Sequence, residues 1–435
     1  MKTSLKLGII TLITSLALAP LVAQQPQQTQ LKQPAPATQP KTQTLQDAIQ
    51  GGKASIDARL RYEFVDQDGY ANNASAITLR TRLGYTTAPF HGLDAGLMAE
   101  NVVALVSDYY DGITPKAGYP QVGDPATTEV SQVWLRYTSA PAATQATLGR
   151  QRIYLDNGRF VGDGAWRQDN QTYDAIALKN TSVKNLAINY AWLWRINRSQ
   201  GDQRDWRSNS HLINLSYAPC QYATVTAYGY LLDFYNPSLP ASAAATAQAA
   251  GTKTFGASLV GNPALNKNLK LNYRLEYARQ NNYGHNHVDY SAHYFTAELG
   301  ATLLAKYALA LGYEQLASDN GQSFRTPIAS NHGFNGWSDF LSPGNNVAGG
   351  IRDYYVRANI TLPANLQLIA WYHKLDNDLT GKTYGNEYDA SLAYRLNKNI
   401  AFMVKTAFFN SANTAGQTPA TPSINKFWLQ TEYTF

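Results

Sequence analysis

Arginine side chains crowd one short stretch of the chain, from Gly149 to Asp174. The stretch holds four arginines, four aspartates and one tryptophan. A guanidinium group binds a carboxylate through two parallel hydrogen bonds, so this composition predicts a polar surface that handles charged ligands. The residues suit catalysis as well as binding, and the elements around them must decide between the two.

The overall composition narrows the class of protein. The chain has 435 residues, of which 15% are charged and 12% aromatic, and its mean hydropathy of −0.35 argues against a helical membrane protein. The length allows two or three soluble domains or one large barrel. A formal net charge of +6 is modest for this length and does not indicate a nucleic-acid partner. The single cysteine, Cys220, excludes an internal disulfide and a cysteine-based zinc site.

The N-terminal residues have the pattern of a secretory signal. Lys2 and Lys6 precede an apolar run, Leu7 to Ala19, that is too short to span a bilayer. We expect cleavage near Ala23, so residues 1–23 form the signal peptide and the mature charge is +4 after loss of the two lysines. Residues 24–52 are rich in Gln, Pro, Thr and Ala and predict a disordered periplasmic spacer, with a weak helical signal at 45–50.

From Lys53 to Phe435, apolar and polar residues alternate with period two, which predicts β-strands. In the first segment Leu60 and Tyr62 fall on one face, and Arg59 and Arg61 on the other. Segments of on the order of 10 residues, the length of a tilted membrane-crossing strand, recur about 18 times. They begin near residues 53, 75, 92, 128, 143, 171, 185, 208, 222, 253, 268, 289, 304, 351, 364, 385, 399 and 424. The expected fold is all-β, a transmembrane antiparallel up-and-down barrel in the bacterial outer membrane.

The connections support this fold, because long and short ones alternate as they do in outer-membrane barrels. The long ones, such as 153–170 and 317–350, would lie outside the cell, and tight turns such as 139–142 in the periplasm. Aromatic residues near strand ends resemble interfacial girdles. The terminal strand ends in Phe435 and resembles the signal read by the outer-membrane insertion machinery, which we expect as a partner together with membrane lipid and lipopolysaccharide.

The charged face of such a barrel lines a water-filled lumen, so its basic residues are the candidate pore-lining and substrate-binding set. A narrow lumen lined by arginine attracts anions. The competing interpretation is that these charges pair with one another and only solvate the pore. The candidates are Arg59, Arg61, Arg80, Arg82, Arg136, Arg150, Arg152, Arg167, Arg195, Arg274, Arg357, Arg395 and Lys405.

Two stretches resemble the alginate-export family of outer-membrane porins. The first runs from Leu148-Gly149-Arg150-Gln151-Arg152 through Trp166-Arg167-Gln168 to Thr172-Tyr173-Asp174. The second joins Thr326-Pro327 to Gly333-Phe334-Asn335-Gly336-Trp337-Ser338-Asp339. The resemblance implies a monomeric barrel of 18 strands whose arginine-rich constriction passes an anionic polysaccharide such as alginate or related uronate sugars. It does not identify the solute.

Three other functions remain open. The first is a general porin of low selectivity, and the second is an adhesin that uses the loop at 317–350. The third is an enzyme, because Asn331-His332 resembles the Asn-His pair of outer-membrane phospholipases, although no serine follows at the required place. We expect no enzymatic activity, no cofactor and no metal site, and we interpret the acidic loop segments 66–69 and 108–111 as solvated.

Overall fold

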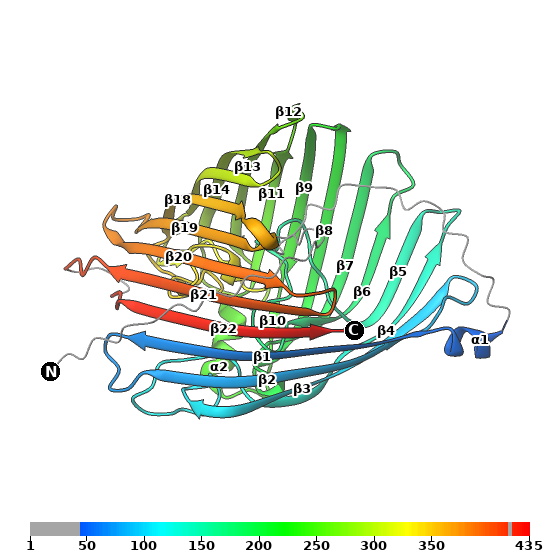
Figure 1. Cartoon of the computed structure of the whole chain (residues 1–435), viewed down its shortest axis with the longest axis horizontal. Coiled ribbons are helices and arrows are strands. Elements are labelled where there is room, and N and C mark those ends of the chain that lie inside the picture. The colour runs from blue at the N-terminus through cyan, green and yellow to red at the C-terminus, as the bar shows by residue number, and fades with distance from the viewer. Residues whose placement is uncertain (1–43, 416–419) are drawn as a thin grey trace.

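The structure, a computed structural model, describes residues 44–415 and 420–435. In this part of the chain, antiparallel strands close into a barrel, with β22 hydrogen-bonded to β1 (Figure 1). The expected signal peptide and most of the expected spacer lie outside the described residues.

The barrel wall contains 18 strands, as predicted, and each begins within a few residues of its predicted position. They are β1 (Lys53–Gln67), β2 (Ala74–Thr86), β3 (Leu93–Asp108), β4 (Thr127–Ser139), β5 (Thr144–Gln151), β6 (Thr172–Asn180), β7 (Leu186–Asn197), β8 (Trp206–Cys220), β9 (Ala223–Leu232), β11 (Thr252–Gly261), β13 (Leu269–Asn282), β14 (Ser291–Leu303), β15 (Tyr307–Leu316), β18 (Ile351–Thr361), β19 (Gln367–Asp376), β20 (Thr383–Arg395), β21 (Ile400–Ser411) and β22 (Ile424–Thr434).

The remaining elements are short and lie in the connections. They are the helices α1 (Leu45–Gln50) and α2 (Ala241–Ala249), the 3-10 turns η1 (Asp202–Arg204), η2 (Asn331–Gly333) and η3 (Pro363–Asn365), and the short strands β10 (Phe234–Tyr235), β12 (Ala264–Asn266), β16 (Ser318–Asp319) and β17 (Gln322–Ser323). No helix among the described residues is long and apolar enough to cross a membrane.

The two faces of the wall differ as the alternation predicts. On β1, Leu60 is 45% exposed and faces outward, whereas Arg61 beside it is 1% exposed and faces inward. Leucine, valine and aromatic side chains cover the outside of most strands, where they meet lipid rather than water. The polar interior is therefore enclosed by an apolar outer surface.

Connection lengths alternate around the barrel, which places the long loops at one end and both the start of β1 and the end of β22 at the other. These two strand ends share their side of the barrel with tight turns such as 140–143 and 396–399. Because bacterial barrels have short turns on the periplasmic side, the long loops face outward from the cell.

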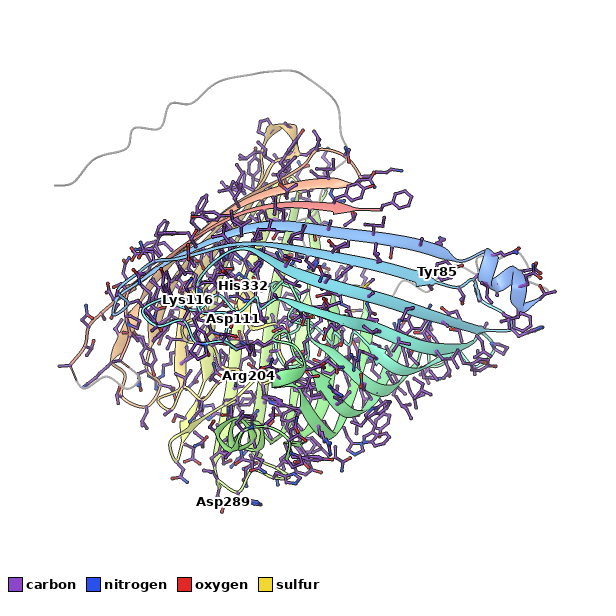
Figure 2. All side chains as sticks on the ribbon, turned by 90° about the horizontal axis from the view of Figure 1, so that it is seen from below. Tyr85, Asp111, Lys116, Arg204, Asp289 and His332 are labelled. Atoms are coloured by element: carbon purple, nitrogen blue, oxygen red, sulfur yellow. The ribbon has the colours of Figure 1, made fainter. Side chains whose placement is uncertain are left out.

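The weak helical signal at 45–50 corresponds to α1, at the periplasmic end. Thr44 caps this helix through the backbone N–H of Asp47, whose carboxylate accepts from the Thr44 N–H in return. The Tyr85 hydroxyl on β2 donates to the Ile49 carbonyl and holds α1 against the β1–β2 pair (Figure 2). The chain therefore enters the barrel through a fixed helical turn.

The opposite faces of β21 yield a test of the membrane arrangement. Val404 is 40% exposed on the outside, and its neighbour Met403 lines the internal cavity. We expect Val404→Arg to lower the free energy of unfolding by about 2–4 kcal/mol, because it places a charge among lipid chains. Met403→Arg, which adds the same charge to the aqueous side, should change it by less than about 1 kcal/mol. Urea unfolding in lipid vesicles measures both, and equal effects would contradict the assignment of faces.

Candidate pore constriction

Two loops fold into the barrel and meet there, and they contain the two stretches singled out in the sequence. The first loop, residues 152–171, joins β5 to β6, and the second, residues 317–350, joins β15 to β18. Val161 and Ile328 form a parallel β-bridge. The Gly162 N–H donates to the Ile328 carbonyl over 2.9 Å, and the Ser330 N–H donates to the Gly158 carbonyl over 2.9 Å. The loops thus form one hydrogen-bonded body inside the lumen.

Glycine at position 162 permits this close contact. A Cβ atom there would lie 2.8 Å from the Ser330 backbone nitrogen, closer than real side chains approach. The Gly162 carbonyl also accepts a hydrogen bond from the Tyr173 hydroxyl at the start of β6. The absence of a side chain at position 162 therefore lets the two loops touch.

Arginines on β1 and β2 hold the first loop against the wall. Arg59 Nη1 lies 3.1–3.4 Å from three consecutive carbonyl oxygens, those of residues 165–167. Arg80 and Arg82 donate to the Gln168 carbonyl over 3.4 and 3.3 Å. Carbonyl groups of a loop buried in a barrel need donors, and the guanidinium groups supply them. Part of the arginine set therefore supports the loop rather than facing a solute.

The same arginines are also neutralised by carboxylates. Arg59 and Arg80 share Glu432 at 3.2 and 3.3 Å, and Arg80 also pairs with Asp57. Arg82 pairs with Glu100 on β3. Buried charges persist only when they are paired, so this part of the wall contributes little free positive charge.

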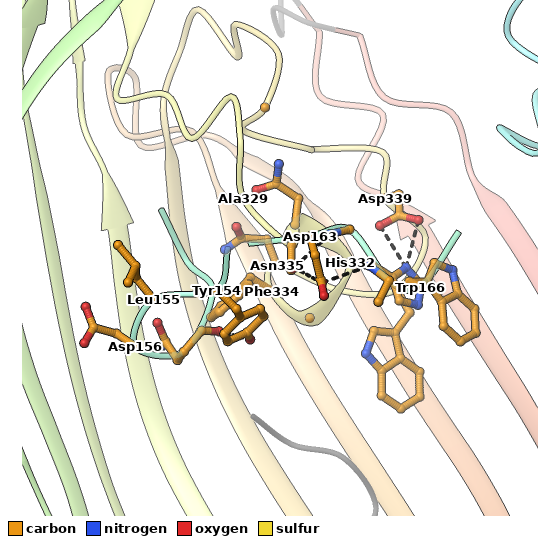
Figure 3. Close-up of a pocket in the computed structure, with 18 of the residues that line it drawn as sticks. Tyr154, Leu155, Asp156, Asp163, Trp166, Ala329, His332, Phe334, Asn335 and Asp339 are labelled. Carbon is orange, nitrogen blue, oxygen red and sulfur yellow. Dashed lines mark hydrogen bonds and ion pairs between the residues drawn. The ribbon is translucent and has the colours of Figure 1, made fainter. Parts of the chain in front are cut away.

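A second cluster joins both loops to β21 and β22. The Trp166 ring of the first loop stacks on His332 of the second at 4.1 Å (Figure 3). The Lys405 ammonium on β21 lies 4.0 Å from the Trp166 ring and 3.6 Å from the Trp337 ring. It is also 2.6 Å from His332 Nε2. We call Trp166, His332, Trp337, Asp339 and Lys405 the latch cluster.

Charge fixes the protonation of the latch cluster. His332 Nδ1 contacts the Asp339 carboxylate at 2.8 Å, so Nδ1 carries a proton and Nε2 accepts from Lys405. Burial lowers the pKa of His332 well below its usual value, and Lys405 lowers it further against the opposing effect of Asp339. Burial opposes ionisation of Asp339, yet His332, Lys426 and Arg167 together hold the pKa of that carboxyl below its usual range. His332 is therefore neutral and Asp339 ionised at neutral pH.

The lumen left beside these loops is a cavity of about 3190 Å³. Fifteen lysines and arginines line it, against eight aspartates and glutamates. Among the described residues, no group of three or more His, Cys, Asp and Glu side chains is arranged to hold a metal ion. The cavity is thus polar and carries an excess of positive charge.

Most of the predicted pore residues line this cavity. They are Arg59, Arg61, Arg82, Arg152, Arg167, Arg274, Arg357, Arg395 and Lys405. Several of them have carboxylate partners: Arg167 contacts Glu63 at 3.2 Å, and Arg357 contacts Glu298 at 3.0 Å. Arg395 differs, because it lies exposed beside the short turn at 396–399 and donates to the Lys398 carbonyl over 3.5 Å.

Arg150 and Arg195 are placed differently from the prediction, since neither lines the cavity. Arg150 pairs with Asp174 at 2.8 Å on the face that Leu148 shows to the lipid. On β7 the register shifts between Leu193 and Arg195, so an extra residue separates them. Such a bulge reverses the faces beyond it, which turns Arg195 outward and buries Ile196 at 0% exposure.

Arg80 and Arg136 do face inward but lie apart from the cavity. Arg80 is fully buried beneath the first loop. Arg136 stays near the periplasmic end of β4, where its Nε contacts Asp94 at 3.0 Å and its guanidinium covers the Trp134 ring at 4.7 Å. Strand periodicity locates a face, but it does not show which part of that face a loop covers.

Several basic residues that line the cavity are not among the predicted pore residues. Arg198 and Arg204 lie in the loop between β7 and β8, and Arg325 lies in the second inward loop. None of the three has a carboxylate within ion-pairing distance among the described residues. Loops carry no face periodicity, so no sequence pattern indicates that these positions line the cavity.

Two loop residues are more buried than the sequence suggests. Arg159 lies in the loop between β5 and β6, yet it is fully buried and pairs with Glu314 at 2.8 Å. The side chain of His332 is 11% exposed within the latch cluster. Both residues depend on the contact between the two loops, which their local sequence does not reveal.

Comparison with known proteins agrees with this architecture. A protein family described as alginate export matches residues 53–384. A search of the curated proteins found no match.

Several solved structures share this fold at low sequence identity. OccK9 (OpdG) of Pseudomonas aeruginosa is 15% identical with a TM-score of 0.68, and the match covers 89% of this chain and 99% of that one. OccAB3 of Acinetobacter baumannii is 14% identical with a TM-score of 0.68, over 89% and 100% of the two chains. OpdK of Pseudomonas aeruginosa, solved with vanillate, is 14% identical with a TM-score of 0.66, over 88% and 98%. These likenesses concern the fold alone.

The anchoring role of Arg80 gives one prediction. Arg80→Gln removes a buried positive charge and leaves less positive charge to balance the Asp57 and Glu432 carboxylates. We expect it to lower the free energy of unfolding by about 3 kcal/mol. Arg136→Gln, which breaks an ion pair whose arginine side chain is 34% exposed, should cost less than about 1 kcal/mol. Urea unfolding followed by tryptophan fluorescence compares the two, and equal losses would remove Arg80 from its anchoring role.

The latch cluster gives a prediction about pH. Because the folded protein lowers the pKa of His332, the cluster contributes its full stability above the unfolded value of about 6.5. This stability is lost as the pH falls below that value toward the lowered pKa. Tryptophan fluorescence should therefore report loosening of Trp166 on acidification below pH of about 6.5. His332→Gln should flatten this profile, and His287→Gln, in an exposed loop, should leave it unchanged; a wild-type profile in the His332 variant would refute the assignment.

Proposed function

The chain belongs to the alginate-export family, and we propose that its barrel is an outer-membrane channel for passive diffusion of anionic solutes. Uronate-type sugars and anionic polysaccharides such as alginate are the substrate class that we infer. The barrel fold and the outer-membrane location come from the family match and the closed strand arrangement. The preference for anions is the proposal.

One observation carries this preference: the cavity is lined by fifteen basic and only eight acidic side chains. Excess positive charge in a narrow lumen with low-dielectric walls raises the local concentration of anions. The excess is greatest at Arg204 in η1 and Lys270 on β13, which have no carboxylate partner in the part of the chain that the structure describes. These two lie near opposite ends of the cavity, so a positive potential would extend along the path.

The chemistry of the lining suits sugar acids. Guanidinium groups bind carboxylates through paired hydrogen bonds, and a uronate residue carries one carboxylate per sugar. The exposed Tyr154 and the half-buried Trp371 also line the cavity and offer flat apolar surface to sugar rings. A chain of uronates would meet both kinds of group repeatedly.

A general porin of low selectivity is the second candidate, and ion pairing favours it. Arg59, Arg82 and Arg357 each have a carboxylate within 4 Å, which cancels much of their field. In an anion-preferring channel the unpaired basic residues favour anions over cations, whereas in a general porin they have little effect on ion selectivity.

Catalysis has little support in the lumen. His332 Nε2 contacts Lys405 rather than a hydroxyl group. The nearby Ser338 donates to Glu387 over 2.7 Å, so it is not positioned as a nucleophile for that histidine. We therefore propose a channel without enzymatic activity.

Bilayer recordings under a KCl gradient test the proposal. We expect a reversal potential that indicates preference for chloride over potassium. Arg204→Gln combined with Lys270→Gln should lower the anion-to-cation permeability ratio by roughly threefold, because it reduces the lumen potential by an amount of order kT. Oligouronates added to one side should block the wild-type current more strongly than uncharged oligosaccharides of the same length.

The matched control removes the same charges from outside the lumen. Arg207 on β8 and Lys374 on β19 face away from the cavity, so Arg207→Gln combined with Lys374→Gln should leave the ratio unchanged. A wild-type channel that prefers potassium would overturn the proposal. Equal ratios in the lumen variant and the wild type would favour the general porin instead.

A further inference from the structure

Three neighbouring strands carry a basic patch on the lipid-facing surface near the outer end of the barrel. Lys253 lies on β11, Arg279 on β13 and His293 on β14, and all three side chains are exposed. Each alternates with inward-facing residues, for example Thr254 and Ala278, which are buried inside the barrel. None of the three lines the internal cavity. We call these residues the outer basic patch.

The register of the sheet brings the patch together. Arg279 pairs directly with His293 on β14 and with Phe255 on β11. Lys253 lies two residues beyond Phe255 toward the outer end, which makes it the diagonal neighbour of Arg279. Cross-strand neighbours have Cβ atoms about 5 Å apart and diagonal neighbours about 7–8 Å. Two cations and an imidazole thus share a surface small enough to contact one phosphate group.

Both cations of the patch lack a carboxylate partner within residues 44–415 and 420–435. Neither Lys253 nor Arg279 has an acidic group within ion-pairing distance among the described residues. Arg279 Nε donates to the Ser291 hydroxyl over 2.9 Å, which orients the guanidinium plane. Asp319, on β16, accepts the Ser291 backbone N–H over 2.7 Å. The terminal nitrogens of Arg279 therefore remain available.

The depth of the patch matches a lipid headgroup. Along β13, Arg279 is followed toward the membrane centre by Tyr277 and Leu275, which are 53% and 48% exposed. Along β11, Lys253 is followed by Phe255, which is 58% exposed. A sequence of cation, aromatic ring and aliphatic side chain is the order expected across the interface of a bilayer. The cations therefore sit where lipid phosphates lie.

In the described part of the chain, other strands do not carry adjacent unpaired cations at the outer rim of the barrel. The patch is therefore more than an ordinary charged edge that water solvates. At corresponding outward positions, β20, β21 and β22 carry Asn386, Asn410 and Asn425, and β1 carries Asp66. The other outward basic residues near this rim are mostly neutralised: Arg352 contacts Asp378 at 2.7 Å and Lys374 contacts Asp376 at 3.4 Å. Adjacent unpaired cations are found on the β11–β14 side.

We propose that the outer basic patch binds a phosphate of a phosphorylated lipid in the outer leaflet, a lipid A-type glycolipid. The Arg279 guanidinium and the Lys253 ammonium contact the phosphate oxygens, and His293, stacked near Tyr277 at 6.4 Å, borders the site. The exposed Phe255 and Tyr277 rings lie against the acyl chains below. Figure 2 locates this side of the barrel by Asp289, in the loop that joins β13 to β14. The site is independent of the solute that passes through the lumen.

Lipid retention by the full-length protein in detergent tests this proposal. Native mass spectrometry would measure binding of bis-phosphorylated lipid A, of dephosphorylated lipid A and of inorganic phosphate. We expect the phosphorylated lipid to bind at least about tenfold more tightly than the dephosphorylated one. Lys253→Gln combined with Arg279→Gln should remove this difference. Inorganic phosphate should not displace the lipid, because the acyl chains contribute to its binding.

Matched variants separate a lost site from a damaged fold. Lys374→Gln removes a paired outward lysine and should retain lipid as the wild type does. Lys253→Arg combined with Arg279→Lys keeps both charges and should retain most of the binding, and heat-modifiable mobility on gels would confirm folding of each variant. Equal binding of the two lipids by the wild type, or undiminished preference in the Gln double variant, would overturn the proposal.

Discussion

The closed hydrogen-bond ladder of the wall is the constraint on which the rest of the structure depends. No water reaches the bilayer core, so every backbone N–H and C=O at that depth must find its partner within the protein. The pairing of β1 with β22 satisfies the last open edge, from Asp57 opposite Thr434 to Gln67 opposite Ile424. Once the ladder is closed, side chains alternate between lipid and lumen, and all polar chemistry is confined to the inside and the rims.

The confinement of polar groups to the inside of the barrel explains why so many arginines lie there. The two inward loops bring unpaired carbonyl groups into a space that the wall cannot satisfy with its own backbone. Arg59, Arg80 and Arg82 donate to carbonyls of residues 165–168, and carboxylates such as Glu432 balance their charge. Only basic residues outside this supporting layer remain free to act on a solute. The interior thus divides into a neutralised scaffold and a smaller, electrically active lining.

The latch cluster joins the two inward loops to the barrel wall. Trp166 and His332 come from different loops, and Lys405 comes from the wall, so one ammonium group between two indole rings fixes both loops at once. Its hydrogen bond to neutral His332 makes the position of the loops sensitive to acidification, whereas the ladder of the wall is not. Pore dimensions and wall stability therefore rest on different interactions.

Local periodicity and turn chemistry determined much of this protein. They specify 18 strands, their boundaries within a few residues, the faces of strands such as β1 and β2, and the lumen location of residues such as Arg61 and Lys405. Tertiary structure alone decided three further points. The bulge at Leu193–Arg195 turned Arg195 outward, the loop contact buried Arg159 and His332, and loop folding brought Arg198 and Arg325 to the cavity. The reason is physical: alternation records which face meets lipid, but contacts between distant loops leave no periodic trace in the chain.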